Sequence, residues 1–224
     1  MLSDMSHASF VHLNVHTEYS LSDGIARIRA IPDHARQMGM PAVAMSDIAN
    51  LYAAVKFYRA CKDAGVKPIF GVELAMDVSD HGEAGGPIIL LCKNNTGFRQ
   101  VSELLTSLYT RPRQGESLSL TIDQLKPLAA HVMILAGFDS SIGKLARTGH
   151  LDEAIDLASQ FGDTFKDGFF LELSRTERSG EAQFEEAAFQ IAAELAIPLV
   201  ATNAVRFLSP EDFEAHEIRT CIHQ

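Results

Sequence analysis

The chain has 224 residues, of which 46% are hydrophobic and 21% charged, a composition that excludes a disordered or fibrous protein. The formal charge of −10 argues against a dedicated binder of nucleic acid or of anionic membranes. The three cysteines form no CxxC pair, and the sequence shows no secretory signal and no apolar run near the roughly 20 residues of a spanning helix. We therefore expect a reduced, cytoplasmic protein.

Seven short apolar runs are predicted to be strands. They are rich in Val, Ile, Leu and Phe, and several are apolar nearly throughout. Continuous apolarity is typical of strands that are covered on both faces, as in parallel sheets. The predicted strands are residues 10–16, 42–47, 68–73, 87–92, 132–136, 169–173 and 198–202.

Most segments between these strands have the apolar spacing of amphipathic helices. Gly39 and Gly65 are predicted to end the first two helices, and Ser209 is predicted to cap the last. The predicted helices are residues 32–38, 51–64, 98–109, 151–161, 180–195 and 210–223. This alternation predicts an α/β fold, either a βα-repeating barrel or an open sheet.

The organisation of the chain is predicted to be simple. Residues 1–9 are expected to form a flexible tail, and residues 10–224 a single domain. The segments 79–87 and 111–119 are rich in Gly, Pro and Ser and are expected to be excursions within that domain. Residues 215–224 still have a helical pattern without a stop signal, so we expect the chain to be the amino-terminal piece of a longer one.

Polar side chains stand at the ends of five predicted strands. Function in barrels and open α/β sheets collects at the carboxyl ends of the strands, and His, Asp and Glu suit zinc, manganese or iron. Polar residues are equally ordinary where strands meet solvent, so both interpretations remain open. No HExxH, glycine-rich phosphate loop or GxSxG motif supports nucleophilic catalysis. The strand-end residues are His16, Asp47, Glu73, Glu172 and Asn203.

Other polar residues have plainer interpretations. His12 and His216 are predicted to be structural histidines and His131 to be a loop residue. The small basic turn at residues 109–113 is predicted to be a solvated loop.

Residues 11–24, VHLNVHTEYSLSDG, resemble the opening motif of the PHP (polymerase and histidinol phosphatase) domain family. More narrowly, they are similar to the PHP domains at the amino termini of bacterial replicative DNA polymerases. The resemblance implies a distorted seven-stranded (β/α)7 barrel, similar to a TIM barrel, with polymerase domains beyond it. It continues through residues 40–47, 67–73, 91–98, 170–173, 200–207 and 212–218.

The sequence departs from the metal-binding motifs of active family members. Their opening His-x-His corresponds to Asn14 and His16, and their Asp-His corresponds to Asp47 and Ile48. The carboxylate of the third motif is retained as Glu73.

The later motifs depart further. Pro87 stands where a His is expected, and Ala204 and Arg206 stand in the late Asp-x-His. Proline and alanine offer a metal no side-chain lone pair, and isoleucine at position 48 offers none either. Arg206 brings a permanent positive charge to the place of a dication, where it could pair with Asp23, Glu73 or His16.

The resemblance therefore implies a vestigial site without catalytic residues or a bound metal. A residual zinc, manganese or magnesium ion, if one binds, would use His16, Asp23 and Glu73. The residues of the vestigial strand-end site are Asn14, His16, Asp23, Asp47, Glu73 and Arg206.

The function implied is that of a non-catalytic scaffold in a chain that synthesises DNA with magnesium. Its partners would be the other polymerase domains, the proofreading exonuclease subunit and other replicase subunits, with DNA bound through the parent protein. One alternative is an active metal-dependent phosphoesterase or 3′–5′ exonuclease that uses His16, Asp23, Asp47 and Glu73. Another is a free-standing barrel enzyme that acts on a small molecule.

Overall fold

The computed structural model describes residues 10–21, 23–77, 85–110 and 118–222. The predicted tail, residues 1–9, lies outside the described residues, as do most of the two Gly/Pro/Ser-rich segments.

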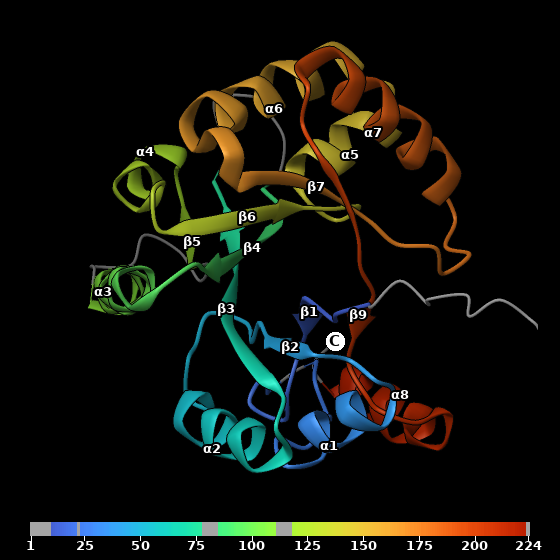
Figure 1. Cartoon of the computed structure of the whole chain (residues 1–224). Helices are drawn as coiled ribbons and strands as arrows, with labels where there is room; N and C mark the ends of the chain where they lie inside the picture. The colour runs from blue at the N-terminus through green and yellow to red at the C-terminus, as the bar shows by residue number, and fades with distance from the viewer. Residues whose placement is uncertain (1–9, 22, 78–84, 111–117, 223–224) are drawn as a thin grey trace, which may run out of the picture.

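The strands form a distorted barrel in the middle of the molecule (Figure 1). Each of the seven predicted runs contributes a strand segment, although the first run is regular over only two residues. A further two-residue strand, β9, follows the seventh run and was not predicted. A short extra strand, β5, pairs with the end of β3 and was not predicted. The strands are β1 (Asn14–Val15), β2 (Ala42–Met45), β3 (Lys67–Met76), β4 (Pro87–Cys92), β5 (Ser119–Leu120), β6 (Val132–Ala136), β7 (Phe169–Leu173), β8 (Leu199–Ala201) and β9 (Ala204–Val205).

Backbone hydrogen bonds, together with the short connection from β8 to β9, join the strands into a ring. The main sheet has the order β2-β3-β4-β6-β7-β8, and β9, which follows β8 closely, pairs in parallel with β1. The circle is completed where Ala44 N–H donates to His12 O and Ser46 N–H donates to Val15 O, both at 2.9 Å. The predicted α/β fold and seven-position distorted barrel are thus confirmed.

Strand β4 differs from the expectation of a parallel sheet, because it runs antiparallel to both neighbours, β3 and β6. An apolar run indicates that a strand is buried on both faces, but it does not indicate whether the strand runs parallel or antiparallel to its neighbours. As a consequence, Pro87 at the start of β4 lies at the same end of the barrel as the carboxyl ends of the parallel strands. We call this end the mouth of the barrel and the opposite end its floor.

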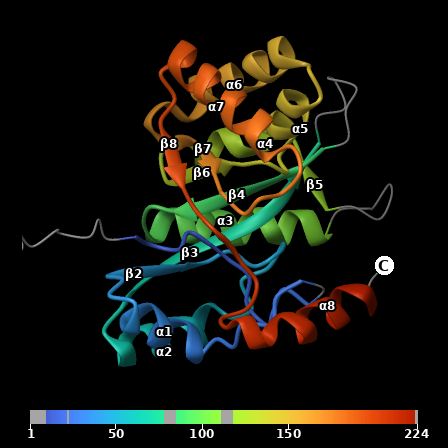
Figure 2. The same ribbon diagram turned by 90° about the vertical axis from the view of Figure 1, so that its right-hand side faces the viewer.

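Helices cover the outside of the barrel. Figure 1 shows α1, α2 and α8 on one side of the strands and α5, α6 and α7 on the other, and Figure 2 shows α8 beside α1. The short α4 and α5 were not predicted. The helices are α1 (Ala30–Gln37), α2 (Ala54–Ala64), α3 (Asn95–Thr110), α4 (Ile122–Leu125), α5 (Ser141–Arg147), α6 (Leu151–Phe165), α7 (Glu181–Leu195) and α8 (Phe213–Ile222).

The predicted helix ends follow from local chemistry. Gly39 and Gly65 adopt φ of 73° and 71°, a left-handed conformation that glycine tolerates, and the chain leaves α1 and α2 at these points. Ser209 caps the last helical segment together with Asp212, and that segment begins as a 3₁₀ turn, Pro210–Asp212, before α8.

Three apolar clusters hold the barrel and helices together. One fills the barrel interior with Ala44, Ile89, Leu91 and Leu135. The other two lie between the strands and the helices, with α1 and α2 on one cluster and α3, α5, α6 and α7 on the other. No helix within the described ranges is both long and apolar enough to cross a bilayer.

Candidate functional site at the mouth of the barrel

The mouth brings together side chains from β1, β3, β7 and the segment around β9. A small cavity of about 110 Å³ opens there. It is lined by six of the residues that the sequence singled out, which are Asn14, Glu73, Pro87, Glu172, Ala204 and Arg206.

His16 is the centre of the mouth, with no exposed side-chain surface. Its Nδ1 lies 2.6 Å from Asp23 Oδ2, and its Nε2 lies 3.1 Å from Glu73 Oε2. Burial opposes a charge on the ring, but the hydrogen bonds to Asp23 and Glu73 outweigh it and raise the pKa of His16 above its usual value. The ring is thus best described as an imidazolium that donates to two carboxylates.

Arg206 supplies the second cation of the mouth. Its Nε forms an ion pair with Asp23 Oδ2, and its Nη2 lies 3.9 Å from Glu73 Oε2. Burial works to raise the pKa of Asp23, but the hydrogen bond from His16 and the charge of Arg206 lower it below its usual value. Of the three pairings foreseen for Arg206, the structure has those with Asp23 and Glu73.

Asn14 connects Arg206 to a buried carboxyl group. Its Oδ1 accepts a hydrogen bond from Arg206 Nη1 at 3.1 Å, and its Nδ2 donates to Glu172 Oε1, also at 3.1 Å. Thr202 Oγ1 donates to the same oxygen of Glu172. Burial raises the pKa of Glu172, although these two hydrogen bonds act in the opposite direction. The carboxyl group packs against Gly137, where an added Cβ would lie 2.8 Å from Glu172 Oε2.

His216 also faces the mouth, which the sequence did not predict. Its Nε2 lies 3.7 Å from Asp23 Oδ1 and has no hydrogen-bond partner among the described residues. The ring packs against Phe207, with centroids 5.4 Å apart. No spacing in the sequence points to this residue, because α8 reaches the mouth only through the packing of the folded chain.

Asp47 lies in a separate network. Its Oδ1 accepts hydrogen bonds from Thr17 N–H at 2.7 Å and Ser20 Oγ at 2.6 Å, and its Oδ2 accepts one from Thr17 Oγ1 at 2.8 Å. These bonds fix the loop that carries Asp23. The same loop needs Gly24, where a Cβ would lie 2.2 Å from the Thr17 carbonyl oxygen. Asp47 therefore positions the mouth without joining its ionic network.

Asn203 and Ile48 do not extend the network either. Asn203 is exposed, and within the described residues its side chain makes no hydrogen bond. Ile48 lies beside Glu73 in a parallel bridge, so an apolar side chain stands where the family motif has a histidine.

The other histidines lie elsewhere. His12 lines a second cavity with His34 and meets Phe10 edge to face, with centroids 5.0 Å apart. His131 Nδ1 lies 3.2 Å from Asn94 Nδ2. In the predicted basic turn, Tyr109 Oη donates to Ala49 O at 3.0 Å, while positions 111–113 lie outside the described residues.

The donor set at the mouth does not fit a metal ion. Both ring nitrogens of His16 are bonded to carboxylates, and the guanidinium of Arg206 lies against the carboxylate of Asp23. Ile48, Pro87 and Ala204 offer no lone pairs. In the part of the chain that the structure describes, no three His, Cys, Asp or Glu side chains are arranged to hold a metal.

Comparison with known families agrees with this fold. The family model for the PHP domain matches residues 12–176, and the chain belongs to this family. Within it, the chain is homologous to the amino-terminal region of DNA polymerase III subunit alpha. The *Escherichia coli* K12 subunit is 36% identical over 220 residues, and that of *Pseudomonas fluorescens* is 39% identical over 219 residues. These alignments cover 98% and 96% of this chain but only 19% and 18% of the relatives.

Solved structures share the fold. One is a Bifidobacterium adolescentis protein that is described as a proposed metal-dependent phosphoesterase. It superposes with a TM-score of 0.63 at 14% sequence identity, and the match covers 95% of this chain and 97% of that one. Another is a two-domain Bacteroides vulgatus protein that contains a PHP-like domain. It superposes with a TM-score of 0.55 at 12% sequence identity, and the match covers 92% of this chain and 55% of that one.

Proposed function

We propose that this chain is the amino-terminal PHP domain of a DNA polymerase III alpha subunit, spanning residues 10–224, and that it is a non-catalytic scaffold with a degenerate metal site. The single observation that carries this proposal is the position of Arg206, whose guanidinium pairs with Asp23, bonds Asn14 and faces Glu73. In a metal-dependent relative a dication would neutralise such carboxylates.

The charges at the mouth support the scaffold role. Two carboxylates, of Asp23 and Glu73, face two cations, His16 and Arg206, so the group is neutral without a metal. A partly buried carboxylate without a partner is costly, and a guanidinium satisfies it with several directed hydrogen bonds. A dication entering this site would meet two positive charges and would have to displace them.

The proposed partners follow from the relatives, of which this chain spans about a fifth. They are the remaining polymerase domains of the same chain, the proofreading exonuclease subunit and the other replicase subunits, in the cytoplasm. The parent protein would bind DNA and polymerise with magnesium. We expect the 224-residue chain alone to leave a primed template unextended, and extension by the purified chain would refute this.

Metal content tests the degenerate site directly. We would restore the family ligands together, as Ile48→His, Pro87→His, Ala204→Asp and Arg206→His, and measure zinc and manganese by elemental analysis after gel filtration. The restored variant should retain metal, and the wild-type chain should retain far less than one equivalent. Stoichiometric metal in the wild-type chain would contradict the proposal. Circular dichroism would confirm that the variant is folded.

A residual phosphoesterase is the second candidate, because His16, Asp23 and Glu73 are retained. The ring of His16 lies 2.6 Å from the Asp23 carboxylate and 3.1 Å from that of Glu73. Hydrolysis of bis-p-nitrophenyl phosphate would be measured with zinc, manganese and magnesium. Chelator-sensitive release that is lost in His16→Ala would favour this candidate, and inactivity with all three metals favours the scaffold.

A further inference from the structure

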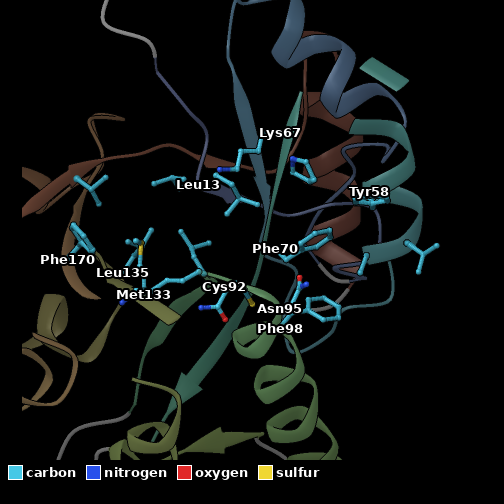
Figure 3. Close-up of a pocket in the computed structure, with 18 residues that line it drawn as sticks. Leu13, Tyr58, Lys67, Phe70, Cys92, Asn95, Phe98, Met133, Leu135 and Phe170 are labelled. Carbon is cyan, nitrogen blue, oxygen red and sulfur yellow. The ribbon is translucent and has the colours of Figure 1, made fainter. Parts of the chain in front are cut away.

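The floor of the barrel, opposite the mouth, contains a large apolar cavity. Its volume is about 680 Å³, against about 110 Å³ at the mouth. Small-molecule sites commonly have volumes of about 300–1,000 Å³ and are mainly apolar with a few polar groups. Leu135 of β6, Phe170 of β7 and Leu13, which directly precedes β1, line the cavity (Figure 3).

The lining of the cavity comes from both sides of the floor. Figure 3 shows Leu13, Leu135 and Phe170 on one side of it and Tyr58, Phe70 and Phe98 on the other. The cavity therefore extends from beneath the barrel strands to the residues of α2 and α3 that complete its lining. An extended apolar chain can reach from one side of this lining to the other.

The polar part of the lining is positive. Lys67 and Lys93 both line the cavity, together with the amides of Asn94 and Asn95, and no Asp or Glu of the described residues does so. Both lysines are exposed, and neither forms an ion pair with a carboxylate of the described residues. In a chain with a formal charge of −10, two unpaired ammonium groups beside an apolar cavity select for an anionic group.

We propose that the floor cavity binds a long-chain carboxylate, with its apolar chain along the barrel floor and its anionic head beside Lys67 and Lys93. This site is independent of the mouth and of the proposed scaffold function. Because each buried methylene contributes about 0.8 kcal/mol, affinity should rise roughly fourfold for each methylene that enters the cavity.

Calorimetric titration of the 224-residue chain with octanoate and dodecanoate, below their micelle concentrations, tests the apolar part. Dodecanoate should bind saturably and at least tenfold more tightly than octanoate. The methyl resonance of Met133, which lines the cavity, should shift on binding, and the variant Met133→Leu would assign it. Absence of saturable binding would overturn the proposal and leave the floor as a surface for a protein segment.

Charge variants test the anionic head. The double variant Lys67→Gln/Lys93→Gln should weaken dodecanoate binding at least tenfold and dodecanol binding less than twofold. Lys62→Gln removes a charge from an exposed lysine of α2 that does not line the cavity, and should leave both affinities within twofold. Equal affinity for dodecanoate and dodecyltrimethylammonium, or an unaffected double variant, would overturn the assignment. Thermal melting would show that all variants are folded.

Discussion

Arg206 donates a hydrogen bond to Asn14 across 3.1 Å although the two residues lie 192 positions apart in the chain. The other end of the Asn14 amide donates to Glu172. A residue that replaces a histidine of the family's opening motif thus bridges the guanidinium to a buried carboxyl group. The replacements at positions 14 and 206 form one polar network, so we expect the mouth to stabilise the fold.

Removal of the guanidinium should be strongly destabilising. Arg206→Met keeps much of the side-chain length but leaves Asp23 and Glu73 with too little positive charge, which should lower the free energy of unfolding by about 3 kcal/mol. Urea denaturation at neutral pH measures the loss. Arg175→Met is the matched control. Arg175 is 79% exposed in its pair with Glu185, so this substitution should lower the stability far less than Arg206→Met. Equal losses in the two variants would contradict the neutralising role of Arg206.

Stability should fall as the pH rises above neutrality. The pKa of His16 in the folded chain lies above 6.5, so its contribution is complete below about pH 6.5 and is lost as the pH passes through the folded value. The difference in urea midpoint between the wild type and His16→Gln should therefore shrink as the pH rises from about 6 to about 9, because His16 loses its proton over this range. His150→Gln, at an exposed histidine, should keep the wild-type slope. A constant difference for His16→Gln would show that folding does not raise the pKa of His16.

Glu172→Gln should be at least as stable as the wild type at neutral pH. Both hydrogen bonds to Glu172 end on Oε1, which glutamine retains, while the charge on a buried group is removed. Because the folded pKa of Glu172 lies above 4.5, the wild type binds its proton more readily when folded. The wild type should therefore gain stability relative to the variant as the pH falls through the folded pKa. Urea midpoints measured from neutral pH down to about 4.5 follow this gain in stability. A variant that is clearly less stable than the wild type at neutral pH would contradict the prediction.

Removal of the side chain should destabilise the fold much more at Asp47 than at Asn203, although both were predicted as strand-end residues. Asp47→Ala leaves the buried Thr17 N–H and the Ser20 hydroxyl without their acceptor and should cost about 2–3 kcal/mol. Asn203→Ala changes an exposed side chain and should cost less than about 0.5 kcal/mol. Thermal and urea unfolding of both variants provide the comparison. Similar costs at the two positions would show that the Asp47 network does not organise the loop.

Much of the mouth followed from local chemistry. The resemblance to the PHP family implies that positions 48, 87, 204 and 206 are ligand positions, and residues without lone pairs at the first three and a guanidinium at the fourth then predict a weak metal site. The resemblance to the PHP family then placed His16, Asp23 and Glu73 near Arg206, and the structure has all four in contact. The sequence placed Asp47 with them, but a carboxylate at a strand end can turn toward its own loop, as Asp47 does.

The sequence by itself determined where most of the strands and helices lie, because apolar runs, helical spacing and glycine stop signals depend on residues that are close together in the chain. Only the tertiary structure decided the direction of β4, the approach of His216 to Asp23 and the cavity at the floor. Burial patterns record how much of a side chain is covered. Which distant segment covers it depends on contacts between elements that no local pattern contains.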